Sequence, residues 1–237
     1  RRNFAYGIIT LCLFLFLSMA GSAIPASYLT EVQGYRPLQT MPTALMIALP
    51  QLLLAPLVAA VINRNWVDSR YVIGGGLMLL ALACVGGSLI TSDWIRDDLY
   101  VLQILHAFGQ PMVVVPLLMN ATGVIHPMEG PFASSMVNTM RGLFSVVAAS
   151  ALENFVTHRE HLHSNTLLDA LGSKHQALAP LLNENTTSSI AERIREQAFV
   201  LSFSDAYLAS LSVITVLLVV LLTLPKRAFP PQPPVSP

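Results

Sequence analysis

The chain has 237 residues, of which 54% are hydrophobic and 11% charged, and its 13 Lys and Arg residues balance 13 Asp and Glu residues. Soluble domains carry about a quarter charged residues, so this chain has too few to cover a water-facing surface. The zero net charge argues against a nucleic-acid partner, which requires a basic patch. Cys12 and Cys84 both lie in apolar stretches and predict neither a disulfide framework nor a metal site.

Six apolar segments are long enough to cross a bilayer core, which takes roughly 20 residues per helix. The first follows Arg1 and Arg2 and is too long for a signal peptide, whose apolar region has about 7–15 residues. We therefore expect an all-α membrane protein built as a six-transmembrane-helix bundle. The predicted spans are residues 4–29, 40–62, 71–91, 99–124, 132–156 and 199–224.

Prolines and glycines within these spans indicate kinks and close helix packing. The second span contains three prolines and the fourth contains two, which are expected to kink both helices. The third span carries the glycines at 74–76 and the pair Gly86 and Gly87, which leave room for another helix to approach closely.

The distribution of basic residues predicts the topology. Six spans place both termini on one side, and the short segments on that side are more densely basic than those on the other, so both termini are predicted to be cytoplasmic. Residues 1–156 then hold the first five spans, and 157–198 form an extracytoplasmic loop, with helical spacing at 166–182 and 188–200 that favours a helical hairpin on the outer surface. Residues 199–224 form the last span, and 225–237 form a Pro-rich cytoplasmic tail.

Histidines cluster at the start of the predicted loop. His158, His161 and His163 are spaced so that a helix would not bring all three to one face. This spacing favours solvated loop histidines over a metal site or a pH sensor.

A polar stripe runs along the fifth predicted span. It consists of Ser134, Asn138, Arg141 and Ser145. Spacings of 4, 3 and 4 residues place these side chains on one helical face, which must meet other helices or a water-filled cavity. Arg141 lies about 14 Å along the span at 1.5 Å per residue, close to the bilayer midplane. Its guanidinium could act on a transport pathway, by binding an anionic group or pairing with a carboxylate, or it could lock helices together.

A second polar stripe lies in the fourth span, where Gln103, His106 and Gln110 recur at spacings of 3 and 4 residues. A histidine on such a face is more often a hydrogen-bonded packing group than a proton carrier, and both interpretations stay open. Gln51, which follows Pro50 in the middle of the second span, is a similar candidate for substrate contact.

Asp205 lies about a turn and a half into the last span. Burial would let it exchange a proton, whereas water at the outer mouth would leave it an ordinary carboxylate near a helix N-terminus. Glu153, near the outer end of the fifth span, is expected to be interfacial. The candidates for the substrate or proton pathway are therefore Gln51, Gln103, His106, Gln110, Asn138, Arg141 and Asp205.

No enzymatic motif is evident. The sequence contains no Walker motif, dinucleotide fingerprint or HExxH, and Gly86-Gly87-Ser88 with His106 is too common a pattern to indicate an intramembrane protease. We expect no enzymatic activity and no cofactor.

Several stretches, taken in order along nearly the whole chain, carry a family resemblance. They are RRNF at 1–4, GYRPLQT at 34–40, NR at 63–64 with DSR at 68–70, EG at 129–130 with ASS at 133–135, NxxRG at 138–142, and QA at 197–198 with SDAY at 204–207. Together they resemble the C-terminal half of the fourteen-span drug:proton antiporters of the major facilitator superfamily, the EmrB/QacA type. Asn63 and Met41 depart from the family pattern, and Asn63 stands where an acidic residue is usual.

The resemblance implies one of two pseudosymmetric halves that rock about a central cavity in the bacterial inner membrane. In this frame Asn138 and Arg141 match the family's Asn-x-x-Arg element, and Asp205 matches its acidic position in the final helix. The family's Gly-Pro antiporter signature and the acidic residue of its first helix belong to the N-terminal half and are absent here. The chain is therefore expected to be a fragment or split gene product, inactive without that half.

The resemblance also implies the partners and the activity. The implied partners are the lipid bilayer, the missing N-terminal half, protons, an amphipathic organic substrate and, as in some family members, a periplasmic membrane-fusion protein. The expected activity is proton-coupled multidrug efflux. Two alternatives stay open: a six-span scaffold or subunit that does not transport, and a family member that exports a physiological solute.

Overall fold

The computed structural model describes residues 2–64, 67–123, 127–172 and 184–222, and these residues are helical with short connections and no strand. The α-helices are α1 (Arg2–Glu31), α2 (Pro37–Ile62), α3 (Ser69–Gly87), α4 (Tyr100–Thr122), α5 (Gly130–Gly172) and α7 (Glu184–Leu222). A short 3₁₀ turn, η1 (Pro127–Glu129), precedes α5.

Five of these helices, α1, α2, α3, α4 and α7, are long and apolar enough to cross a membrane. The chain is therefore a multi-pass membrane protein. The remaining predicted span, 132–156, lies in α5, which is not among the five. Asn138, Arg141 and Glu153 lower the hydropathy of this helix.

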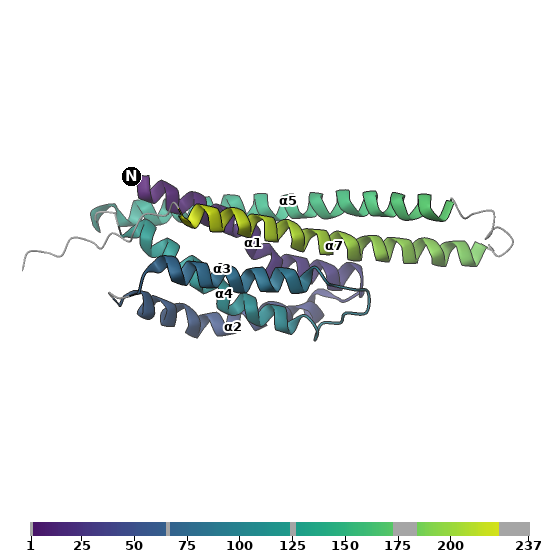
Figure 1. Cartoon of the computed structure of the whole chain (residues 1–237), viewed down its shortest axis with the longest axis horizontal. Helices are drawn as coiled ribbons and strands as arrows, with labels where there is room; N and C mark the ends of the chain where they lie inside the picture. The colour runs from purple at the N-terminus through teal and green to yellow at the C-terminus, as the bar shows by residue number, and fades with distance from the viewer. Residues whose placement is uncertain (1, 65–66, 124–126, 173–183, 223–237) are drawn as a thin grey trace, which may run out of the picture.

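Helix α1 is the centre of the bundle. It packs against α2, α4, α5 and α7, while α3 packs against α4 and α7. Figure 1 shows α2, α3 and α4 grouped on one side and α5 and α7 running side by side on the other. The buried face of α1 includes Leu17, Ala20, Ile24 and Tyr28, all fully buried. Their spacings of 3, 4 and 4 residues are those of one helical face, so α1 contributes this stripe to the core.

Glycines allow the helices to approach closely, as the third predicted span indicated. A Cβ atom added at Gly76 would lie 2.9 Å from the backbone oxygen of Gly109 in α4, and one added at Gly87 would lie 2.6 Å from the ring of Tyr207 in α7. Side chains at these positions would push the helices apart, so the two glycines set the spacing of α3 from its neighbours.

One end of the bundle is fastened by polar contacts to the segment 88–99. The Tyr28 hydroxyl lies 2.6 Å from the carbonyl oxygen of Thr91, to which it donates, and Ser204 donates to the carbonyl oxygen of Ser88 at 2.6 Å. Tyr28 also packs edge-on against Phe203. We call this end, which carries residues 32–36 and 88–99, the hairpin end, because α5 and α7 project beyond it (Figure 1).

Helices α5 and α7 are longer than a bilayer requires. With 43 and 39 residues they extend about 65 and 58 Å at 1.5 Å per residue, against a hydrocarbon core of about 30 Å. The predicted boundaries at 156 and 199 are therefore not helix ends, because α5 continues to Gly172 and α7 already begins at Glu184. Residues 157–171 contain neither Pro nor Gly, so nothing in them interrupts the helix. Residues 173–183 and the predicted tail at 225–237 lie outside the described residues.

Candidate functional site

The structure joins two of the predicted polar positions between α2 and α4. The Gln51 amide Nε2 donates to the Gln110 side-chain oxygen at 2.8 Å. Gln103 and His106, on the same stripe of α4, are fully buried. We call Gln51, Gln103, His106 and Gln110 the α2–α4 polar cluster.

Helix α1 covers this cluster at Gly21. A Cβ atom added there would lie 2.8 Å from the His106 ring and 3.0 Å from the Gln110 Nε2 atom. Within the described part of the chain, both side-chain polar atoms of Gln103 and both ring nitrogens of His106 lack a hydrogen-bond partner. Buried polar groups are normally satisfied. The cluster therefore offers four polar atoms to a further partner in the middle of the bundle.

The α5 stripe lies apart from this cluster. Asn138 and Arg141 are exposed on the surface of the chain, and Ser145 is half-buried. No hydrogen bond or ion pair joins Arg141 to another of the described residues. A guanidinium on a bundle helix without a counter-charge is costly in lipid. If this face of α5 lies in a membrane, it requires a polar or charged neighbour beyond the described residues.

Asp205 is the centre of an ion-paired group between α7 and α5. Its Oδ2 atom accepts from Arg159 Nε at 2.7 Å and lies 2.5 Å from Arg159 Nη2 and 2.7 Å from His163 Nε2. The three side chains are between 18 and 32% exposed. Asp205 is thus neither a lone buried acid nor an ordinary carboxylate at a helix N-terminus. It joins α5 to α7 near the hairpin end.

Arg159 and His163 were not predicted as partners of Asp205. Arg159 and His163 fell in the segment interpreted as a loop, where His163 was expected to be solvated. Because α5 continues through them, their i, i+4 spacing places both on the face that meets α7. The helical spacing itself was the available signal.

Replacing Asp205 with asparagine should weaken the α5–α7 pairing. The amide side chain would retain the shape but leave the Arg159 charge without its partner, so we expect a loss of about 1–3 kcal/mol in the free energy of unfolding. Thermal or denaturant unfolding of the purified chain measures this loss. Asp97→Asn is the matched control, since Asp97 pairs with Arg96 in an exposed turn. Equal effects of the two substitutions would contradict a fastening role for Asp205.

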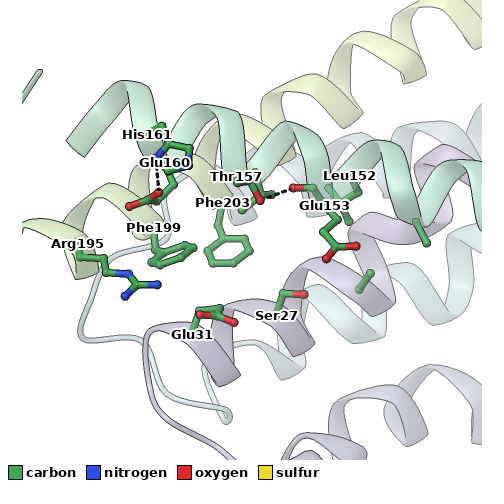
Figure 2. A pocket seen from close by; sticks show the side chains of 13 residues that line it. Ser27, Glu31, Leu152, Glu153, Thr157, Glu160, His161, Arg195, Phe199 and Phe203 are labelled. Atoms are coloured by element: carbon green, nitrogen blue, oxygen red, sulfur yellow. Dashed lines mark hydrogen bonds and ion pairs between the residues drawn. The ribbon is translucent and has the colours of Figure 1, made fainter. Parts of the chain in front are cut away.

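A cavity of about 530 Å³ opens at the hairpin end, between α1, α5 and α7. Figure 2 shows its polar lining, contributed by three helices. Glu31 comes from the end of α1, Glu153 and Glu160 from α5, and Arg195 from α7. The Arg195 guanidinium lies 5.6 Å from the ring centre of Phe199, as a cation–π contact.

The cavity combines both signs of charge with aromatic surface. Phe203 is fully buried beneath it, and the Glu160 side chain is only 12% exposed, with His161 Nδ1 3.5 Å from its carboxylate. Among the described residues, no ion pair joins Arg195 to any of the lining carboxylates. Glu153 and His161 of this lining were considered from the sequence, but the cavity was not predicted, because its residues are brought together by the packing of three helices.

Comparison with models of known protein families found no match, and a search of curated proteins found no relative of the chain. In the described residues no group of three or more His, Cys, Asp or Glu side chains could hold a metal ion.

Proposed function

We propose that the chain is the C-terminal half of a proton-coupled exporter of amphipathic organic compounds, of the major facilitator type, in a bacterial inner membrane. The second half would complete the central cavity and carry most of the proton coupling. The sequence resemblance suggests this identity, and the geometry of α5 supports it.

The exposed stripe of α5 is the observation that carries the proposal. A six-helix protein that functions alone would be expected to bury Asn138 and Arg141 in its own core, whereas both side chains are exposed and have no partner among the described residues. Such a surface suits the wall of a water-filled cavity shared with another helical bundle. In a scaffold protein, contacts with other residues would satisfy the hydrogen-bonding groups of Asn138 and Arg141, and water would not need to reach them.

The α2–α4 polar cluster supplies a second element that transport can use. Its unpartnered Gln103 and His106 atoms are enclosed by α1, α2 and α4, so a change in the spacing of these helices would change their access to water. Proton and substrate shift a transporter between states only if they bind the two states differently. Within this chain, we assign the groups whose proton binding differs between the two states to His106 and to the Asp205 ion pair.

Thiol labelling in the native membrane tests the proposal. Asn138→Cys and Ser145→Cys should react with a water-soluble maleimide, because both positions would line the aqueous cavity. Leu143→Cys is the matched control, because Leu143 is exposed and lies two residues, about 200° of helix, from Arg141, on the opposite face of α5. Cys12 and Cys84 are buried and should add little background.

We expect positions 138 and 145 to react several-fold faster than position 143. Protection of both stripe positions would favour the scaffold alternative and contradict the exporter. Equal reaction at all three would show that α5 stands in water, which would contradict its place in the bundle wall.

A further inference from the structure

A second, apolar cavity adjoins the one at the hairpin end. It has a volume of about 180 Å³ and lies between the same three helices, α1, α5 and α7. Leu152 lines both cavities, so they are neighbours. The apolar cavity is formed largely by alanines and by the aromatic side chains of Phe16 and Phe155.

The two cavities follow one another in depth along all three helices. On α1 the polar cavity reaches from Glu31 to Ala23, and the apolar one lies deeper, at Met19 and Phe16. The seven residues from Ala23 to Phe16 correspond to about 10 Å of helix. Along α7 the lining changes in the same direction, from Arg195 to Val213. A polar site at the end of the bundle thus continues into an apolar site nearer the bilayer centre.

The charges of the polar cavity select the kind of ligand. Three carboxylates, those of Glu31, Glu153 and Glu160, would repel an anionic headgroup and attract an ammonium group, which the Phe199 and Phe203 rings would also favour. Arg195 would repel a simple cation but suits a phosphate. A group that carries both signs complements the whole lining.

We propose that the two cavities together hold an aminophospholipid of the phosphatidylethanolamine class. Its ammonium group binds the carboxylates, its phosphate binds Arg195, and part of one acyl chain enters the apolar cavity. The polar cavity has the size typical of small-molecule sites, which is about 300–1,000 Å³. This inference depends on the chain lying in a membrane and not on export, so either idea can fail alone.

Native mass spectrometry of the purified full chain tests the site. Phosphatidylethanolamine and phosphatidylglycerol with identical acyl chains are titrated separately, and the fraction of lipid-bound protein is measured. We expect phosphatidylethanolamine to bind about tenfold more tightly, since only it supplies the ammonium group. Glu153→Gln and Arg195→Gln should each weaken its binding by about tenfold.

Two control variants remove the same charges outside the cavity. Glu192 and Arg193 lie on the same helix as Arg195, are exposed and line neither cavity. Glu192→Gln and Arg193→Gln should therefore leave lipid binding unchanged. Circular dichroism confirms that each variant keeps its helix content. Equal affinity for the two lipids would overturn the proposal.

Measuring ethidium binding as well distinguishes a lipid-binding site from a site that binds organic cations. If phosphatidylethanolamine occupies the cavity through both of its charges, Arg195→Gln should weaken lipid binding and leave any ethidium binding intact or stronger. Binding of ethidium to the wild-type chain combined with lipid binding that is insensitive to Arg195→Gln would show a cation site and overturn the lipid assignment.

Discussion

Replacing Arg141 with leucine should abolish export by the transporter that contains this chain. In the proposed arrangement the guanidinium lies in the cavity wall and pairs with an anionic group of the other half or of the substrate. Losing a charge-assisted contact of this kind costs about 1.5–3 kcal/mol, which corresponds to about ten- to a hundredfold in an equilibrium constant. Efflux of a fluorescent amphipathic dye from loaded cells measures the loss.

Arg141→Lys is the informative companion. Lysine keeps the charge but cannot form the bidentate contacts of a guanidinium, so we expect partial activity. Because Arg141 is exposed and makes no hydrogen bond or ion pair among the described residues, neither variant should lower the amount of protein in the membrane. Normal export by Arg141→Leu would contradict a pathway role. A loss of protein from the membrane would instead indicate a structural lock.

Gly76→Ala should destabilise the bundle by about 1–3 kcal/mol, the usual cost of overpacking. The new Cβ atom would lie 2.8 Å from the Met112 Cβ atom and 2.9 Å from the Gly109 carbonyl oxygen. Because the second contact is with backbone, relief requires α3 and α4 to separate, and α3 has few other neighbours. The midpoint of thermal unfolding of the purified chain measures the effect.

Gly142→Ala is the matched control, because it is the same substitution at a position where the new Cβ atom meets no other atom. Nothing lies within 4 Å of a Cβ atom at Gly142 in α5, so only the gain in helix propensity remains, up to about 1 kcal/mol in the stabilising direction. If the two substitutions changed the unfolding midpoint alike, the close approach of α3 and α4 would not determine stability.

The sequence was a good guide to the helices and a poor one to their ends. The predicted spans 4–29, 40–62 and 99–124 lie within two or three residues of α1, α2 and α4, because apolar runs bounded by charges or turns are strong signals. The third span ended too late: α3 stops at Gly87, before residues that turn back toward Tyr28. Helical spacing at 166–182 and 188–200 was recognised, but these stretches were interpreted as a separate hairpin within a polar loop, so their continuity with the helices on either side was missed.

The site was predictable only within single helices. Spacing along α4 correctly grouped Gln103, His106 and Gln110 on one face, but the contact of Gln110 with Gln51 depends on how α2 packs, which no local pattern encodes. The same limit explains Asp205, whose partners are more than 40 residues away in the sequence. The cavity at the hairpin end could not be predicted either, because its charged residues come from three separate helices.

The central place of α1 has a consequence for how the protein is made. Translation releases α1 before the other described helices, so the α1 surface against which α2, α4, α5 and α7 pack is already present when each of them is made. Among these helices only α3 is made before its packing partners, because α4 and α7 are both synthesised after it. The bundle can thus be assembled in the order of synthesis, with α3 held in lipid until α4 arrives.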